Sequence, residues 1–534
     1  MPLLYHAYVY LEFLILACTI YILAPKRMVC INVWERLAIE QKGITTMQDT
    51  NWNQIEWELL SEATEIAPPW KDGHFFNTFN LDMDGIRQIR IWRDEEYMLR
   101  AEASGQYKKR EGEEEPEPGV VERSTLKGWW NHSYEAKLIQ CIPENTTTNY
   151  LLREERAEVA CKMSVCKIKV KPAKGVPKQE RVSLVEWCIN APDSTVLYVE
   201  STERKVRTKL CKKRDRSEDT YQPHREEAFS RDTVYITFEG TGCYISRVSK
   251  KYDPQWAEKL SIEYRDAFGG VPDKKTREAV RELAGFLMGR DLKLIGRSEY
   301  DRGGYIIRAM AQNPQSVNIR KVCQLCNQEI VPVHVYGDDS LNFKETMEAL
   351  LPVYLHSEMR EAIHATLPLY WSSFILYVDN AIPVIASAIE ALQKSWFALE
   401  ENQSAAVYYP KAEFRKVRKQ LIDILDAQLE ESLYKNAVKN KVDQLNMMSV
   451  RDRNTLFFEQ LGIEYGENEV RAVRMRNVFA HGDTNGGEQV DEMIDAIKVL
   501  QMLYAKSVLK ILGYEGDYID WAENHERKIM RNVE

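Results

Sequence analysis

Arg-Asn-Val-Phe-Ala-His-Gly, at residues 476–482, is the stretch that decides how the fold of this 534-residue chain is interpreted. The residues before it have helical spacing, and a glycine directly after His481 is typical of a helix end. Asn477 and His481 are four positions apart and therefore share one face of that helix. The stretch predicts the C-terminal end of a helix over roughly residues 467–481.

Arg476, Asn477 and His481 are the residue types needed to cut an RNA backbone without a metal ion. The guanidinium of Arg476 is permanently charged and holds a phosphate through two parallel donors. The imidazole of His481 exchanges a proton near neutral pH, and Asn477 can orient it. In the opposite interpretation, Arg476 pairs with an acidic neighbour and His481 only ends a helix.

The motif lies in a segment whose apolar residues have helical spacing from about residue 346 to 513. Asp452 or Asn454 is expected to cap a short helix within it. Helices joined by short links favour a bundle of four or five. The clearest apolar stripes are Ile385-Ile389-Leu392-Trp396 and Phe414-Val417-Leu421-Ile424.

The part of the chain before this segment is predicted to be rich in β-strands. Short runs of β-branched and aromatic residues, such as 86–92 and 233–238, are separated by turn-forming residues. A helix is predicted over Thr276–Met288, and a hairpin with a glycine turn is predicted over residues 292–308. The sequence therefore predicts an α+β multidomain protein, with a β-rich N-terminal region followed by a C-terminal all-α helical bundle.

Residues 3–24 are almost wholly apolar and precede Lys26 and Arg27. One interpretation is a membrane anchor, since the run is long enough to span a bilayer and the basic residues would keep the body inside. The other, favoured by Glu12 within the run, is that Met28 is the true start. Both place the body in the cytoplasm, and the protein would be membrane-tethered only if residues 3–24 are translated.

The formal net charge of −9 gives no general attraction to nucleic acid, so an RNA site must be a local basic patch. Basic residues crowd two runs, 167–181 and 204–216. The denser second run indicates contact with nucleic acid or an acidic protein. The alternative is a strand edge protected by lysines.

Ten cysteines are scattered along the chain, as expected of a reduced cytosolic protein. Cys323 and Cys326 form half of a zinc site, and His334 follows eight residues later. A structural zinc ion needs four ligands, usually from two such pairs. No cofactor is therefore expected, and a structural zinc at Cys323 and Cys326 is the alternative to buried thiols.

The motif resembles the Arg-x4–6-His signature of the HEPN superfamily (higher eukaryotes and prokaryotes nucleotide-binding domains). Glu469, Arg471, Arg474 and Gly482 around it are similar to the ApeA-type branch, which contains bacterial anti-phage nucleases. The resemblance covers the C-terminal third and, more loosely, the segment before it. It implies a HEPN helical bundle and a homodimer or higher homo-oligomer, in which two motifs face one cleft.

The resemblance implies a metal-independent endoribonuclease that acts in anti-phage defence by abortive infection, restrained until a phage-derived activator appears. RNA would be cut by attack of the 2′-hydroxyl, which leaves a 2′,3′-cyclic phosphate. Arg476, Asn477 and His481 would be catalytic. The alternative from another class is a catalytically silent HEPN scaffold that binds a nucleotide or a partner.

Three further residues receive roles from position or resemblance. Arg471 and Arg474 would extend the RNA-binding surface, unless they pair with neighbouring Glu467 or Glu469. Glu390 would be an auxiliary acid near the site, and a solvated helix face is its alternative.

Five segments are expected along the chain. They are the apolar extension 1–27, a β-rich sensor or substrate domain 28–255, a mixed connecting segment 256–345, the helical nuclease domain 346–515 and a tail 516–534.

Overall fold

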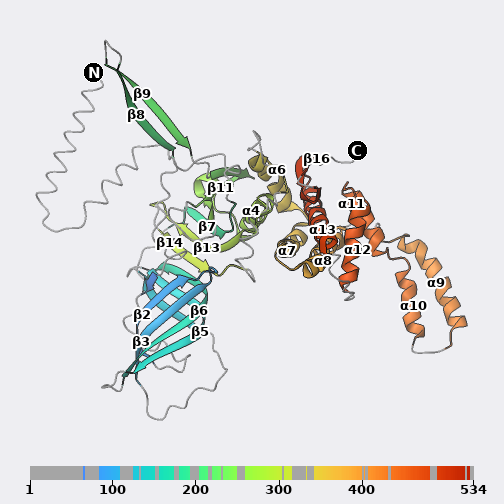
Figure 1. Ribbon diagram of the computed structural model, residues 1–534. Helices are drawn as coiled ribbons and strands as arrows, with labels where there is room; N and C mark the ends of the chain where they lie inside the picture. The colour runs from blue at the N-terminus through green and yellow to red at the C-terminus, as the bar shows by residue number, and fades with distance from the viewer. Residues whose placement is uncertain are drawn as a thin grey trace, which may run out of the picture. The chain divides into compact units, whose positions relative to one another are not determined.

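A computed structural model gives the structure of the protein, which is α+β (Figure 1). Residues 52–534 belong to one compact unit. The structure describes residues 64–66, 83–108, 124–130, 134–150, 156–173, 180–192, 204–214, 219–229, 233–248, 259–303, 306–315, 332–333, 342–399, 402, 407–430, 434–480, 490–523 and 526–529.

Twelve strands of the described residues form one sheet, in the order β1-β2-β3-β6-β14-β13-β7-β12-β11-β10, with β5 paired to β6 and β4 paired to β5. Every pairing in this sheet is antiparallel. The strands are β1 (Thr64–Ile66), β2 (Met83–Arg93), β3 (Leu99–Lys108), β4 (Ser124–Trp130), β5 (Tyr134–Tyr150), β6 (Arg156–Pro172), β7 (Ser183–Ile189), β10 (Thr233–Phe238), β11 (Thr241–Arg247), β12 (Lys259–Arg265), β13 (Lys293–Tyr300) and β14 (Ile306–Gln312).

β6 connects the two halves of this sheet. One of its edges pairs with β5, while the other pairs first with β3 and then with β14. β12, β13 and β14 come from the segment 256–345, and β12 and β13 pair directly with β7. The sheet therefore continues across the boundary expected at residue 255, and these strands do not form a separate connecting element.

The second basic run lies on β8 (Arg204–Arg214), which pairs with β9 (Asp219–Phe229) in a separate two-stranded sheet. The first basic run begins on β6, between β5 and β14.

α4 (Lys274–Leu287) confirms the helix predicted over Thr276–Met288. Its N-cap is Asp273, whose side chain accepts a hydrogen bond from the backbone of Thr276. Its apolar residues Val280, Leu283, Ala284 and Leu287 have helical spacing and are buried. The predicted hairpin is also present, as β13 and β14.

Helices follow the sheet in the sequence. α8 is central among them, since it contacts α7, α11, α12 and α13. Its predicted stripe faces this core, with Ile385, Ile389 and Leu392 buried. The helices are α6 (Asn342–His356), α7 (Arg360–Ser373), α8 (Val378–Trp396), α9 (Lys411–Gln428), α10 (Lys435–Gln444), α11 (Val450–Gln460), α12 (Glu467–Ala480) and α13 (Val490–Ile511).

Two details of this helical part differ from the sequence predictions. The stripe on α9 forms a helix as predicted but is not buried, with Val417 49% and Ile424 58% exposed, and among the described helices α9 packs chiefly against α10. The cap of α11 is Ser449, not Asp452 or Asn454. Its hydroxyl accepts from the backbone of Asp452, so the helix begins earlier than expected.

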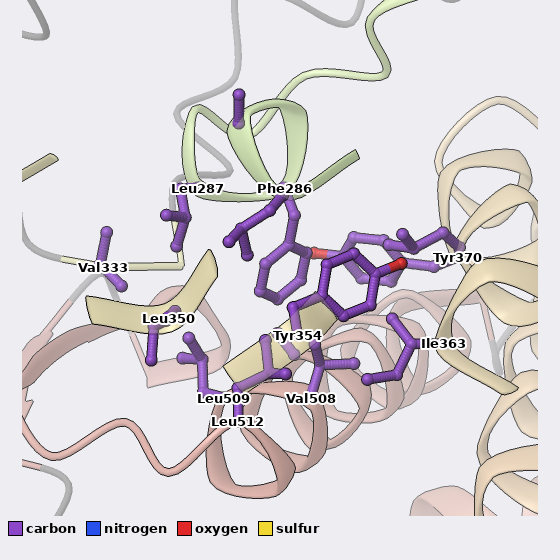
Figure 2. Close-up of a cluster of buried hydrophobic side chains, with 14 of the residues drawn as sticks. Phe286, Leu287, Val333, Leu350, Tyr354, Ile363, Tyr370, Val508, Leu509 and Leu512 are labelled. Atoms are coloured by element: carbon purple, nitrogen blue, oxygen red, sulfur yellow. The ribbon is translucent and has the colours of Figure 1, made fainter. Parts of the chain in front are cut away.

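One hydrophobic core includes residues of the sheet, α4 and the helical part. Figure 2 shows Phe286 and Leu287 from α4 facing Tyr354 of α6, Tyr370 of α7 and the end of α13. Burying each aromatic side chain of this kind contributes roughly 1.5–3 kcal/mol. The core therefore holds α4 against α6, α7 and α13.

The residues expected as a C-terminal tail are also structured. They include β15 (Asp517–Asp520) and β16 (Glu526–Ile529), which pair with each other. Tyr518 bridges to Val333, and Trp521 is 8% exposed within the shared core. The segment 516–529 is therefore partly packed into the fold.

Among the helices of the described ranges, none is both long and apolar enough to cross a membrane. The apolar run 3–24 lies outside the described residues.

Candidate functional site

The motif is carried by α12, which agrees closely with the helix predicted over residues 467–481. The side chain of Glu469 accepts a hydrogen bond from the backbone of Gly466 at 3.0 Å, which satisfies one of the free N–H groups at the helix start. Glu467 and Glu469 in the first turn also suit the positive end of the helix dipole. His481 and Gly482 lie outside the described residues, and Asn477 is described only by its backbone.

Arg476 and Glu390 form an ion pair that joins α12 to α8. Glu390 follows the buried Ile389, so it lies at the border of the core stripe of α8. On α12, Ala472 is one turn before Arg476 and is buried in the same core. This packing of α12 on α8 places the two charged side chains beside each other, although 86 positions separate them in the sequence.

The pair remains accessible to solvent, since the side chains of Arg476 and Glu390 are 30% and 33% exposed. Glu390 therefore does not lie on a freely solvated helix face. Ion pairs with this exposure contribute only about 0–1 kcal/mol. A phosphate can compete with such a carboxylate for Arg476, because the guanidinium has five N–H donors.

The two other arginines of the motif helix are exposed. Neither Arg471 nor Arg474 forms an ion pair with Glu467, Glu469 or any other side chain that the structure describes, so the pairing alternative is not realised. Arg474 is three residues before Asn477 and shares its face of the helix.

Arg471 lies in different surroundings. It lines a cavity of about 300 Å³ whose charged residues are mostly acidic. This arrangement weakens the attraction of Arg471 for a phosphate. The acidic lining residues are Glu469, Glu492, Asp495 and Asp520.

The zinc candidates Cys323 and Cys326 lie outside the described residues. Within the described ranges, no group of three or more His, Cys, Asp or Glu side chains is placed to hold a metal ion. Burial raises the pKa of both Cys141 and Cys188 to about 12, so these thiols are protonated and unreactive at neutral pH.

A second cavity, of about 460 Å³, lies beside α4 and was not predicted from any motif. Its lining combines β6, β13, α4 and α7, which no local pattern connects. The available signal was the basic run 167–181, whose Lys167 and Lys169 line this cavity.

Comparison of the chain with protein-family models, with curated proteins and with solved structures gives no match in any of the three. The resemblance to the HEPN superfamily therefore rests on the motif and the helices around it.

Proposed function

We propose that this protein is a metal-independent endoribonuclease of the HEPN type that acts in the cytoplasm in anti-phage defence. The observation that carries the proposal is the position of Arg476. It lies in the last turns of the motif helix, and its partly exposed guanidinium is paired, among the side chains that the structure describes, with the partly exposed Glu390.

In this proposal the attacking group is the ribose 2′-hydroxyl. A basic imidazole removes its proton, the 2′-oxygen bonds to phosphorus, and Arg476 stabilises the negative charge that develops on the phosphate oxygens. An acid then protonates the departing 5′-oxygen. The products are a 2′,3′-cyclic phosphate and a 5′-hydroxyl, and His481 is the proton carrier.

One imidazole cannot act as base and acid in the same step. We therefore propose a homodimer or higher homo-oligomer in which His481 of one copy removes the proton and the equivalent residue of another copy supplies one. Asn477 would orient the imidazole or contact the phosphate. Arg474 would hold the next phosphate along the RNA, whereas the acidic cavity around Arg471 makes it the weaker contact.

Such an enzyme would damage its own cell if it were always active. We propose that the β-rich region restrains it until a phage-derived activator binds, so that RNA cleavage leads to abortive infection. The alternative is a catalytically silent HEPN scaffold that binds a nucleotide or a partner. The pairing of Arg476 with Glu390 favours it, because the carboxylate neutralises the charge that cleavage needs.

The test is cleavage of total cellular RNA in EDTA, with and without phage lysate. Wild type is compared with His481→Ala and with Arg451→Ala, which removes an exposed arginine of α11. Wild type and Arg451→Ala are expected to leave cyclic-phosphate ends, and His481→Ala is expected to be inactive. Equal cleavage by wild type and His481→Ala would contradict the mechanism. A folded wild type that is inactive under both conditions would favour the scaffold.

A further inference from the structure

α4 has two different faces. One face packs into the hydrophobic core through Phe286 and Leu287 (Figure 2). The other lines the cavity of about 460 Å³ with residues spaced three or four apart, which share a helix face. These residues are Lys274, Arg277, Glu278, Arg281, Glu282 and Gly285.

The lining of this cavity is strongly cationic. Among the residues that the structure describes, eight Lys or Arg and four Asp or Glu line it, an excess of four positive charges in a chain whose net charge is −9. A recessed surface of one sign concentrates its electrostatic field and attracts ligands of the opposite charge. The cavity therefore selects for an anion.

Three of the four carboxylates of the lining have a Lys or Arg partner, and the fourth, Glu282, is paired with a histidine. Glu186 accepts from Arg277 at 3.0 Å and from Arg281 at 2.8 Å. The other pairs are Glu278 with Lys274 at 3.2 Å, Asp291 with Lys293 at 2.6 Å and Glu282 with His364 at 2.6 Å.

Four cations of the lining remain available. Lys167, Lys169, Arg290 and Arg297 form no ion pair with any residue for which the structure describes a side chain. The Nε of Arg290 is buried and has no hydrogen-bond acceptor within the described part of the chain. A buried donor without an acceptor is destabilising, and an anion bound in the cavity would supply the acceptor.

The sheet places two of these cations in one row. Arg297 on β13 is opposite Met310 on β14, and Met310 is opposite Lys169 on β6. Residues directly opposite each other point to the same face of a sheet. Since neighbouring strands are about 4.8 Å apart, Arg297 and Lys169 are separated by roughly 10 Å at the backbone, with space for a chain of phosphates between their side chains.

The lining also contains apolar side chains from α7. They are Leu367, Pro368 and Trp371. The ring of Trp371 lies 4.8 Å from that of Tyr370, which is buried in the core, so the indole has a fixed support. An aromatic ring beside a cationic row suits a ligand that has both a flat base and phosphates.

We infer that this cavity binds a nucleoside polyphosphate, with its phosphates on Lys169, Arg290 and Arg297 and its base against Trp371. The volume lies within the range of about 300–1,000 Å³ that is usual for small-molecule sites. The inference does not depend on the proposed ribonuclease activity, because the cavity and the motif helix have no residue in common.

The test is isothermal titration calorimetry on the full chain with ATP, GTP, CTP, UTP and inorganic tripolyphosphate. At least one nucleotide is expected to bind more tightly than tripolyphosphate. Lys169→Gln, at an exposed position without an ion-pair partner among the described side chains, is expected to weaken nucleotide binding about tenfold, or about 1.4 kcal/mol, because it removes a hydrogen bond between charged groups. Trp371→Ala is expected to weaken binding of the nucleotide but not of tripolyphosphate.

The matched control is Lys162→Gln. Lys162 lies on the same strand β6, but it pairs with Glu102 and is outside the cavity. The affinity of the Lys162→Gln variant for the nucleotide should remain within twofold of that of the wild type. Absence of binding by the folded full chain would overturn the inference. So would equal affinity for nucleotide and tripolyphosphate, or a loss in Lys162→Gln as large as that in Lys169→Gln.

Discussion

Replacing Glu186 with glutamine is expected to lower the free energy of unfolding by about 3–5 kcal/mol, the usual loss when one partner of a buried ion pair is removed. The carboxylate accepts from Arg277 at 3.0 Å and from Arg281 at 2.8 Å. The three side chains, in the order Glu186, Arg277 and Arg281, are only 4%, 8% and 14% exposed. Glutamine would leave two buried guanidinium groups beside a neutral amide.

The electrostatics of Arg281 support this magnitude. Burial is the largest effect and lowers the pKa of Arg281, but the combined attraction of Glu186, Cys188, Tyr264 and Glu282 raises the pKa above its ordinary value, so the guanidinium is charged in the fold. Arg281 remains charged at neutral pH after the carboxylate has been removed, because arginine is not deprotonated in proteins under these conditions.

The assay is urea-induced unfolding of the full chain, followed by circular dichroism and by tryptophan fluorescence. Glu278→Gln is the matched control, since Glu278 is on α4 like Arg277 and Arg281 but pairs with Lys274, whose side chain is 78% exposed. Its loss should be below about 1 kcal/mol. If Glu186→Gln unfolds at the same urea concentration as Glu278→Gln, the buried ion pair does not have the role assigned to it.

Three other outcomes are expected. Glu390→Gln, in a variant that cannot cleave RNA, should tighten RNA binding by up to about fivefold, because the ion pair of Glu390 with Arg476 contributes at most about 1 kcal/mol. Fluorescence anisotropy measures the affinity for RNA, and weaker binding would contradict the prediction. Ser449→Ala should destabilise the fold by about 1 kcal/mol through loss of the α11 cap; unchanged thermal unfolding would argue against that cap. During alkylation at pH 8, the exposed Cys166 should react and Cys188 should not, since burial raises the pKa of Cys188 to about 12. Mass spectrometry distinguishes labelling at the two cysteines, and equal labelling would show that Cys188 is accessible.

Features that depend on local spacing could be predicted from the sequence. The helix α4, the hairpin of β13 and β14, and the motif helix α12 all agree with their apolar periodicity and turn residues. The spacing of apolar residues defines the apolar face of a helix, but it does not show which other element covers that face. On α9 the predicted stripe is present, yet Val417 and Ile424 remain exposed, and among the described helices α9 packs chiefly against α10.

Features that depend on long-range pairing could not be predicted. The run at Lys167 and Lys169 gave no sign that β6 lies beside β14, and this register is what aligns Lys169 with Arg297. At the motif, the sequence nominated Arg476 and Glu390 separately, but their pairing depends on how α12 packs on α8. The sequence can identify charged residues, whereas the tertiary packing determines which of them are available to a ligand.

Burial and the number of partners separate the arginines of this chain into structural and available groups. Arg277 and Arg281 share one buried carboxylate, and an incoming anion would have to break a buried pair to reach them. In the described part of the chain Arg476 is paired with the partly exposed Glu390, so exchanging this carboxylate for a phosphate costs little. Both proposed sites carry available cations within an acidic chain, so their anion affinity should fall steeply with salt. A site whose charges were all buried in fixed pairs would show little salt dependence.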